Sequence, residues 1–444
     1  MIALLLCIVG FVAAYIAGRR SLGAGCVAVL AAGYGYGILR ANLQTPASHF
    51  IFDAPLLGLY VSQFLSDMKK EAGKPRDTAL RYWLLLLMGW PMFLLFLPFQ
   101  SLFVSILGLR TSIMMLPTIL VGARLRSADL RVFALSLAAL NLVALGFGIA
   151  ESIRGIEPFF PLSPVTVTIY GSQDSGNQHR IPSTFQHAHA YGGMMVATLP
   201  FLFGCWARKS GSRKENLFLL LGIGAALFGV LMSATRTGIV SGCFMAFLAF
   251  TSGRMGAWKR WVWVAGVAGV IFSAMQNDRW QRYRQLDPDT VTERVAGSVN
   301  RSFFEILEEY PMGNGLGGGG TNVPYFLAYR VNSPVGAENE YAHILLEQGI
   351  IGLLIWVAFV LWFLTNRSTF VKDEWFTGRR MGWYLTAFGL LSAVLGVGLL
   401  SAIPGTFAFL LTMGWTAVKP QSERQRAFSV MRTRALTARS VVRA

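Results

Sequence analysis

The chain has 444 residues, of which 54% are hydrophobic and 14% are charged, and its mean hydropathy is +0.50. A soluble globular protein of ordinary composition carries about 25% charged residues, so a soluble enzyme domain and an intrinsically disordered chain are both excluded. The 39 Lys and Arg residues exceed the 22 Asp and Glu residues and give a formal net charge of +17. The positions of these basic residues decide between a nucleic-acid partner and a membrane topology.

Apolar segments recur from the first residue to about residue 418, and they have the length of roughly 20 residues that a helix needs to cross a bilayer. We therefore predict an all-α fold, a polytopic transmembrane helical bundle of about 12–13 helices. The predicted spans are 2–18, 21–39, 49–66, 82–98, 100–122, 131–150, 187–206, 217–234, 237–252, 261–275, 344–365, 381–400 and 403–418.

The basic residues are distributed unevenly over the loops between these spans. Alternate loops, from Arg19–Arg20 to the tail that begins at Lys419, contain 28 of the 39 Lys and Arg residues, and the opposite loops contain the other 11. Lys and Arg are retained on the cytoplasmic side of membrane proteins. The first set of loops is therefore predicted to face the cytoplasm, and the basic net charge reflects topology rather than a nucleic-acid partner.

This topology divides the chain into four parts. They are residues 1–275 with transmembrane helices 1–10 and an external loop at about 151–186, residues 276–343 as a long external loop, residues 344–418 with helices 11–13, and residues 419–444 as a basic cytoplasmic tail. Within the long loop, 303–310 (FFEILEEY) has the pattern of a short amphipathic helix. Because a connection of that length usually has structure and a role, we expect function on the external face.

All eight Lys residues belong to the cytoplasmic loops, so every external basic residue is an Arg. Arg presents a planar fork of donors that binds phosphate through two hydrogen bonds, which favours a phosphate-bearing substrate. The alternative is that Lys is simply retained in the cytoplasmic loops, which would also leave only Arg on the external side. Arg236 stands at the junction of two apolar spans, where a charge is unfavourable unless it is paired or functional. A snorkelling structural Arg is the alternative there, and a solvated loop charge is the alternative for Arg180.

Two further external segments have patterns that suit catalysis or binding. In ENEYAHILLEQG, Glu340, His343 and Glu347 recur at helical spacing, and a carboxylate beside a His can orient it and raise its basicity. An ordinary polar helix start is the alternative. PMGNGLGGGG, residues 311–320, is Gly-rich and lacks the Lys of a P-loop. Either its backbone amides bind phosphate or admit a sugar chain, or it is a flexible loop.

Four short motifs follow one another along the chain. They are R-x-x-S-T-F at Arg180–Phe185, S-x-T-R-T-G at Ser233–Gly238, P-x-G-x-G-L-G at Pro311–Gly317 and N-E-Y-x-x-x-L-x-E-x-G-x-x-G at Asn339–Gly352. In their order and external placement they resemble the O-antigen ligase and polysaccharide polymerase superfamily of bacterial inner membranes, over about residues 180–352. The resemblance implies a GT-C-like bundle with its active site and its long, partly helical loop on the periplasmic side.

The resemblance also implies a glycosyltransferase whose donor is an undecaprenyl-diphosphate-linked glycan, with no cofactor and no metal. Arg180 and Arg236 match the arginines expected to hold the diphosphate, where fixed cationic donors stabilise the charge that develops on the leaving group. The substrate-binding residues expected on this basis are Arg180, Arg236, Arg301, Arg330, Asn339, Tyr341, Gly315 and Gly317.

The chain departs from the ligase pattern at one position. Ligases of this family typically read H-N-x-Y, and alignment on Asn339 and Tyr341 puts Glu338 where that His should stand. Either Glu338 replaces the His as catalytic base, or His343 serves from a neighbouring face of the helix. The departure favours a polymerase of exopolysaccharide or O-antigen repeats over a ligase that transfers the glycan to lipid A core.

The expected partners are the lipid-linked glycan donor, a glycan or lipid A core acceptor, membrane lipids, and a polysaccharide flippase or chain-length regulator. The alternative from another class is a non-enzymatic transporter or assembly scaffold for the same glycan. Transporters commonly contain repeated halves, and the sequence has no convincing internal repeat.

Overall fold

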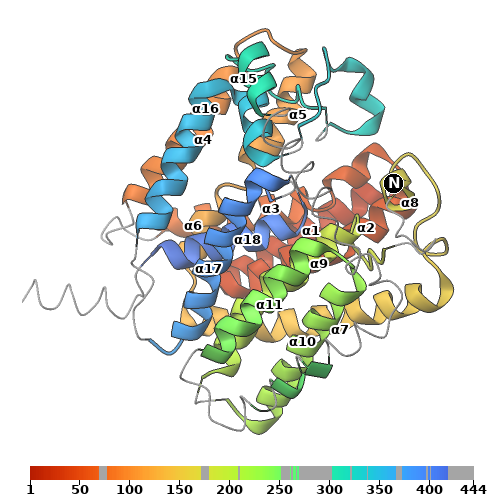
Figure 1. Cartoon of the computed structure of the whole chain (residues 1–444), viewed down its shortest axis with the longest axis vertical. Helices are drawn as coiled ribbons and strands as arrows, with labels where there is room; N and C mark the ends of the chain where they lie inside the picture. Colours follow the sequence, from red (N-terminus) through yellow and green to blue (C-terminus); the bar gives the residue numbers. More distant parts are fainter. Residues whose placement is uncertain are drawn as a thin grey trace, which may run out of the picture.

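The structure, a computed structural model, is all-helical within the residues that it describes (Figure 1). It describes residues 1–69, 78–171, 180–208, 211–251, 303–320, 323–337, 339–366, 373–396 and 402–418, together with 261, 264–266, 268–269 and 399–400.

The helices follow one another with short connections through most of the described chain. The first are α1 (Ile2–Arg20), α2 (Leu22–Leu43), the 3-10 helix η1 (Pro46–Phe50), α3 (Asp53–Lys69), α4 (Thr78–Leu94), α5 (Leu102–Ile113), α6 (Thr118–Ala123) and α7 (Ser127–Arg154). After these come α8 (Val167–Tyr170), α9 (Ala188–Trp206), α10 (Arg213–Met232), α11 (Arg236–Thr251), α15 (Glu305–Glu309), the 3-10 helix η4 (Tyr325–Arg330), α16 (Glu340–Thr365), α17 (Phe376–Ser392), the 3-10 helix η5 (Ala393–Leu395) and α18 (Gly405–Ala417).

The predicted all-α class is confirmed, with two differences in the helices themselves. The predicted span 100–122 is divided into α5 and α6, because Pro117 has no N–H with which to continue the helix and α6 starts after it. The predicted span 381–400 is shorter, since α17 ends at Ser392. The predicted span 261–275 lies mostly outside the described residues, and the predicted tail 419–444 lies entirely outside them.

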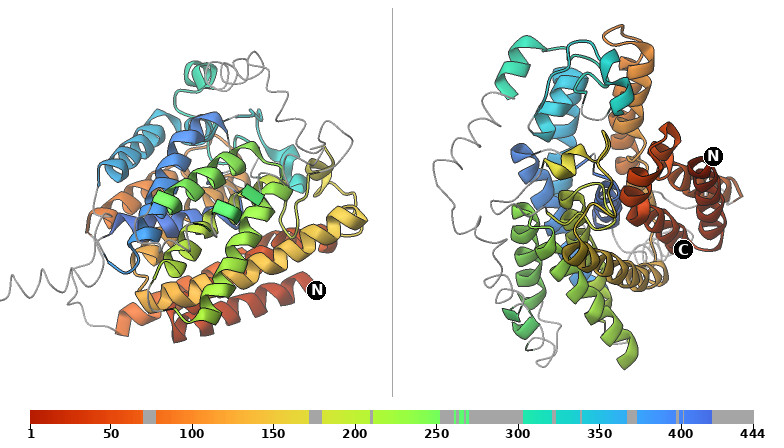
Figure 2. Two further views of the ribbon diagram at one scale, coloured as in Figure 1. Left: turned by 60° about the horizontal axis from the view of Figure 1, so that its bottom comes forward. Right: turned by 90° about the vertical axis from the view of Figure 1, so that its right-hand side faces the viewer.

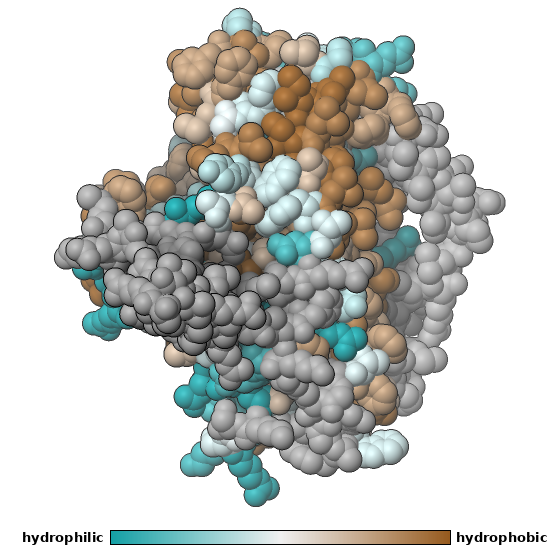
Figure 3. Space-filling model, turned by 90° about the vertical axis from the view of Figure 1, so that its left-hand side faces the viewer, coloured by the Kyte–Doolittle hydropathy of each residue, from teal (hydrophilic) through white to brown (hydrophobic). Residues whose placement is uncertain are grey.

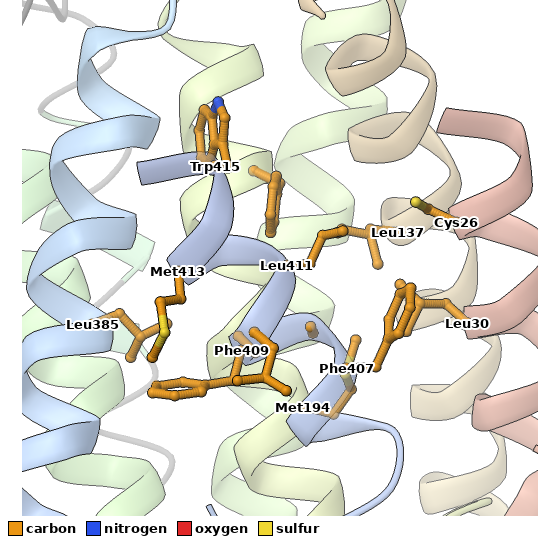
Figure 4. Close-up of a cluster of buried hydrophobic side chains, with 14 of the residues drawn as sticks. Cys26, Leu30, Leu137, Met194, Leu385, Phe407, Phe409, Leu411, Met413 and Trp415 are labelled. Carbon is orange, nitrogen blue, oxygen red and sulfur yellow. The ribbon is translucent and has the colours of Figure 1, made fainter. Parts of the chain in front are cut away.

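Two helices, α9 and α18, form the centre of the bundle. α9 is buried at 17 of its 19 residues and α18 at 12 of its 13 residues, and a helix that is apolar all round belongs in the interior. Figure 4 shows α18 with side chains directed to several neighbours, including Leu385 of α17 and Leu30 of α2. Trp415 of α18 stacks on Phe201 of α9 with ring centroids 5.1 Å apart.

α6 and α18 cross with their backbones in contact. A Cβ at Gly414 would lie 1.8 Å from the carbonyl oxygen of Ile119, and a Cβ at Gly122 would lie 2.1 Å from the carbonyl oxygen of Leu411. Small residues at a crossing let two membrane helices approach this closely. The position of α18 therefore depends on the absence of side chains at both glycines.

The N-terminal helices pack along one flank of the bundle, where Figure 2 shows the long helix α7 beside them. The carboxylate of Asp129 on α7 accepts a hydrogen bond of 3.0 Å from the backbone amide of Gly23 on α2. α1 is buried at only four of its 19 residues, so most of its apolar surface is uncovered within the described chain.

The surface has the character of a membrane protein. Six segments are long and apolar enough to cross a membrane: Ile2–Arg20, Leu22–Leu43, Leu102–Ala123, Ser127–Arg154, Arg213–Met232 and Glu340–Thr365. Large apolar side chains remain exposed on several helices, as with Leu85 of α4 at 68% and Leu354 of α16 at 60%, and Figure 3 shows such residues over a broad area of one face. Because water does not favour exposed apolar area of this extent, the chain is a multi-pass membrane protein.

We predict that Gly414→Ala destabilises the protein, because the added methyl group would overlap the Ile119 carbonyl oxygen. The melting temperature in detergent should fall by at least about 5 °C, measured by size-exclusion chromatography after heating. Gly224→Ala on α10 is the matched control, since nothing lies within 4 Å of its added Cβ and Ala favours the helix. Equal melting temperatures for the two variants would contradict the close crossing.

Candidate active site

α16 is interrupted at Gly349. This residue has φ +68° and ψ −174°, a backbone conformation that only glycine adopts readily, so one helical segment ends before it and a second begins at Ile350. A Cβ at Gly349 would also lie 2.7 Å from the carbonyl carbon of Met312. Both the backbone angles and the neighbouring chain therefore require glycine here.

The Gly-rich loop, residues 311–320, bonds to the backbone groups that the interruption frees. The Asn314 amide donates to the carbonyl oxygen of Leu346 at 2.6 Å, and the Ile350 amide donates to the carbonyl oxygen of Pro311 at 3.0 Å. An unsatisfied backbone group is unfavourable by several kcal/mol in hydrocarbon. The loop and the interrupted helix are consequently one structural unit.

Two neighbouring helices hold this unit in place, and Figure 1 shows α5, α15 and α16 gathered at the same end of the molecule. The indole Nε1 of Trp90, on α4, donates to the carbonyl oxygen of Gln348 at 2.9 Å. On α5, a Cβ at Gly108 would lie 2.2 Å from the backbone nitrogen of Gly317. The Gly-rich loop thus lies directly against α5 and does not behave as the flexible loop that the sequence also allowed.

His343 and Glu347 lie on the first segment of α16, facing the loop. His343 Nε2 is 3.6 Å from Glu347 Oε1, and the exposed fraction of the His343 side chain is 12%. Glu347 is 2% exposed, and the backbone amides of Gly317 and Gly319 face its carboxylate. The helical spacing predicted one shared side for these two residues, and the structure has them in contact.

Asn339 and Tyr341, two of the predicted substrate-binding residues, bond to the protein itself. The Asn339 side chain caps α16 by accepting a hydrogen bond from the Ala342 amide at 2.7 Å. The Tyr341 hydroxyl donates to the carbonyl oxygen of Leu390 on α17 at 2.8 Å. Glu338, the predicted base, lies outside the described residues.

Buried polar contacts hold the Arg180–Phe185 segment. Ser183, with φ +54°, donates its backbone amide to Glu151 Oε2 at 2.8 Å and its hydroxyl to the carbonyl oxygen of Ala144 at 2.7 Å. Glu151 lies in the last turn of α7 and is 1% exposed. Its hydrogen bond with the Ser183 amide fixes the backbone that carries Arg180.

The same segment contacts α2 and α9. The Ile38 amide donates to the carbonyl oxygen of Thr184 at 3.1 Å, which fastens the segment to the end of α2. Arg180 Nη1 lies 3.1 Å from His189 Nε2 on the first turn of α9.

The Ser233–Gly238 segment is the turn between α10 and α11. The Ser233 hydroxyl donates to the carbonyl oxygen of Val230 at 2.7 Å and lies 3.1 Å from the Thr235 hydroxyl, and Ala234 has φ +48°. Arg236 is the first residue of α11 and is half-buried. Among the described residues, no carboxylate forms an ion pair with it.

The Arg180 and Arg236 segments meet at the start of α9. A Cβ at Gly192 would lie 2.4 Å from the Ser233 hydroxyl oxygen and 2.6 Å from the Thr235 hydroxyl oxygen. His189, which contacts Arg180, stands three residues earlier, and residues three apart share one face of a helix. The structure therefore brings these two predicted segments together, whereas His343 and Glu347 belong to a second group on α16.

The start of α9 depends on a neutral histidine. His187 Nδ1 accepts a hydrogen bond of 3.0 Å from the Ala190 amide, which only an unprotonated ring nitrogen can do. Burial lowers the pKa of His187 to about 4, and the neighbouring His189 and Arg40 act in the same direction.

Two more of the predicted site residues, Arg330 and Gly315, contact other parts of the protein. Arg330 is exposed on η4, where its Nε donates to the Tyr329 hydroxyl at 3.0 Å. A Cβ at Gly315 would lie 2.6 Å from the Phe99 side chain, so this glycine packs against the protein. Arg301 lies outside the described residues.

Sequence analysis did not single out Glu151 or Arg110 as members of a site. The bond from Glu151 to Ser183 joins residues 32 positions apart, and its only sequence signal is an acidic residue at the end of an apolar run. Arg110 is one of several external arginines in the sequence. Its ion pair with Asp53 is a tertiary contact, which the local sequence does not indicate.

These features define a multi-pass membrane protein with two groups of polar side chains, one at the start of α9 and one on an interrupted helix. Residues 217–357 match the family model described as O-antigen ligase, so this part of the chain is similar to that family. The matched residues include Arg236, His343 and Glu347, whereas Arg180 precedes them. No curated protein matches the chain.

We predict that Gly349→Ala separates the Gly-rich loop from α16, because the new Cβ would overlap Met312 and the residue would be strained at φ +68°. Hydrogen–deuterium exchange of the Asn314 and Ile350 amides should become at least about tenfold faster, since their acceptors move away. Gly193→Ala on α9, with nothing within 4 Å of its added Cβ, is the control. Unchanged protection in Gly349→Ala would show that the loop does not depend on the interruption.

We predict that acidification destabilises the protein partly through His187. An unfolded His binds a proton below about pH 6.5, whereas the folded His187 has a pKa of about 4. The free energy of unfolding therefore falls as the pH drops through this window, because the unfolded state binds more protons. His187→Asn keeps a cap acceptor and does not titrate, so its melting temperature should fall less between pH 7.5 and pH 5.5. An equal fall in melting temperature for the wild type and for His187→Asn would refute this role of His187.

Proposed function

We propose that the protein is a glycosyltransferase that polymerises undecaprenyl-diphosphate-linked oligosaccharide repeats for exopolysaccharide or O-antigen biosynthesis. The observation that carries the proposal is the contact between His343 and Glu347 on α16, facing the Gly-rich loop, within residues that match the O-antigen ligase family model. An imidazole beside a fixed carboxylate is a pair suited to general base catalysis.

Transfer requires the acceptor hydroxyl to attack C1 of the donor sugar while the bond from C1 to the diphosphate oxygen breaks. Negative charge then develops on the departing diphosphate. Arg180 and Arg236 are the groups proposed to bind it, because their segments meet at the start of α9 and fixed cationic donors stabilise such charge. The half-buried position of Arg236 at the N-terminus of α11 supports this role, since the helix dipole adds positive potential there.

The acceptor hydroxyl must lose its proton as the new glycosidic bond forms. We assign this proton to His343, with Glu347 as the residue that orients the ring. A proton on Nε2, which faces Glu347, leaves Nδ1 as the basic nitrogen. Glu338 stays the alternative base, as predicted from the motif alignment.

The proposed location is the bacterial inner membrane, with the active site facing the periplasm. The support is the charge asymmetry of the sequence, since 28 of 39 Lys and Arg residues fall in the opposite set of loops. A flippase that delivers the lipid-linked repeat to this face and a regulator of chain length are the protein partners that such a reaction calls for.

The second candidate is an O-antigen ligase that transfers the glycan to lipid A core, and the description of the matching family favours it. The two reactions share the donor and differ in the acceptor. The sequence departure at Glu338 is the reason for preferring the polymerase.

The test is reconstitution of the purified protein in liposomes with a synthetic undecaprenyl-diphosphate oligosaccharide, with and without lipid A core, in the presence of EDTA. A ladder of products from the donor alone is expected for a polymerase. A single shifted band that requires lipid A core would identify a ligase, and no transfer from a range of donors would favour a transporter or scaffold.

Within this assay, Arg236→Ala should lower the rate of transfer by at least about 100-fold, because one donor to the leaving diphosphate is lost. Arg154→Ala, at an exposed position on the end of α7, is the matched control and should retain the full rate. Product formation by Arg236→Ala at the control rate would exclude the proposed role of this residue.

A further inference from the structure

Four side chains from the helices α2, α3 and α5 meet the backbone of His49 in a group that the proposed reaction does not use. Arg110 of α5 donates from Nε to Asp53 Oδ2 of α3 at 2.5 Å and from Nη2 to the backbone carbonyl of His49 at 3.1 Å. The Tyr36 hydroxyl of α2 donates to the same carbonyl at 3.3 Å, and the Arg40 guanidinium interacts electrostatically with Tyr36. We call Tyr36, Arg40, His49, Asp53 and Arg110 the α2–α5 cluster.

The α2–α5 cluster carries an excess of positive charge. It contains two guanidinium groups and a single carboxylate, and burial, with Arg40 and Arg110 nearby, lowers the pKa of His49 to about 3, so this ring is neutral. Arg40 Nε is buried and has no hydrogen-bond partner among the residues that the structure describes. A buried donor of a charged group is unfavourable when it is left unsatisfied, so this nitrogen is suited to an anionic ligand.

A cavity adjoins the cluster. It is lined by Asp53 and Arg110 and by the apolar side chains Met114, Met115, Leu400 and Ile403. The Arg110 guanidinium beside this apolar lining suits an amphiphile whose charged head is joined to a hydrocarbon chain.

The helices that carry the cluster contact both groups of the candidate active site. Arg110 stands two residues after Gly108, whose backbone meets Gly317, and the Gly317 amide faces Glu347. Arg40 acts electrostatically on His187, at the start of α9. A ligand bound to the cluster would therefore lie next to both the Arg180 segment and the Gly-rich loop.

We propose that Arg40 and Arg110 form a binding site for the diphosphate of a polyprenyl-linked glycan, with the adjoining cavity receiving the start of its hydrocarbon chain. Two planar guanidinium groups match the oxygens of a diphosphate. This site adds to Arg180 and Arg236 and supplies the lipid-linked glycan directly beside the reacting groups. The choice of a polyprenyl diphosphate, rather than another anionic lipid, rests on the proposed function.

The test measures the binding of undecaprenyl diphosphate to the full-length protein in nanodiscs, without acceptor and without turnover. Arg40→Gln should weaken the affinity at least about tenfold, because Gln keeps hydrogen-bonding capacity and loses the charge and the fork. Arg154→Gln, exposed at the end of α7, should bind as the wild type does. Equal affinity of Arg40→Gln and the wild type would overturn the proposal.

Arg110 needs a paired substitution, because its removal alone leaves the buried Asp53 carboxylate without its partner. The double variant Asp53→Asn with Arg110→Gln removes both charges, and it should also bind undecaprenyl diphosphate at least about tenfold more weakly while it melts near the wild-type temperature. Wild-type affinity in this folded double variant would count against the site.

Two competitors separate the sources of the anion. Inorganic pyrophosphate at millimolar concentration should displace the labelled lipid, and phosphatidylglycerol in equal excess should not. Displacement by phosphatidylglycerol would overturn the assignment to a diphosphate lipid. Since no transfer takes place in this assay, weaker binding by Arg40→Gln would uphold the site even if the reconstituted protein formed no glycosidic bond.

Discussion

The arrangement of the polar residues depends on one constraint, the requirement that backbone groups within an apolar environment be satisfied. Gly349 interrupts α16, and the interruption frees amide and carbonyl groups that a continuous helix would have paired. The Gly-rich loop supplies the missing partners through Asn314 and Pro311. Because those bonds fix the loop, the amides of Gly317 and Gly319 are held against Glu347, and Glu347 is in turn held beside His343.

Close backbone packing also joins motifs that are distant in the sequence, without side chains between them. The end of α2 bonds to the Arg180 segment through Ile38, and the turn that carries Arg236 packs on α9 at Gly192. α5 meets the Gly-rich loop through Gly108. The two groups of polar residues are thereby related through the rigid helices α2, α5 and α9 rather than through a loop.

Hydropathy was sufficient to predict the helices because each buried or lipid-facing segment is apolar over its whole length, as α9 shows. It could not predict the interruption of α16, since Gly349 lies within an apolar run and its φ depends on contact with Met312. Helical spacing did predict the shared side of His343 and Glu347. The anchoring of Ser183 by Glu151 and the pairing of Arg110 with Asp53 depend on tertiary packing, for which local sequence has no signal.

The interruption also divides the dipole of α16 between two shorter helical segments. A helix carries partial negative charge at its C-terminal end, and in α16 such an end lies at Gln348, beside Glu347. In an unbroken helix that end would lie at Thr365, roughly 26 Å farther along the axis at 1.5 Å per residue. His343 therefore lies five residues from a helix end and in contact with the Glu347 carboxylate. The break that makes room for the loop thus brings a source of negative potential to the one imidazole on this helix.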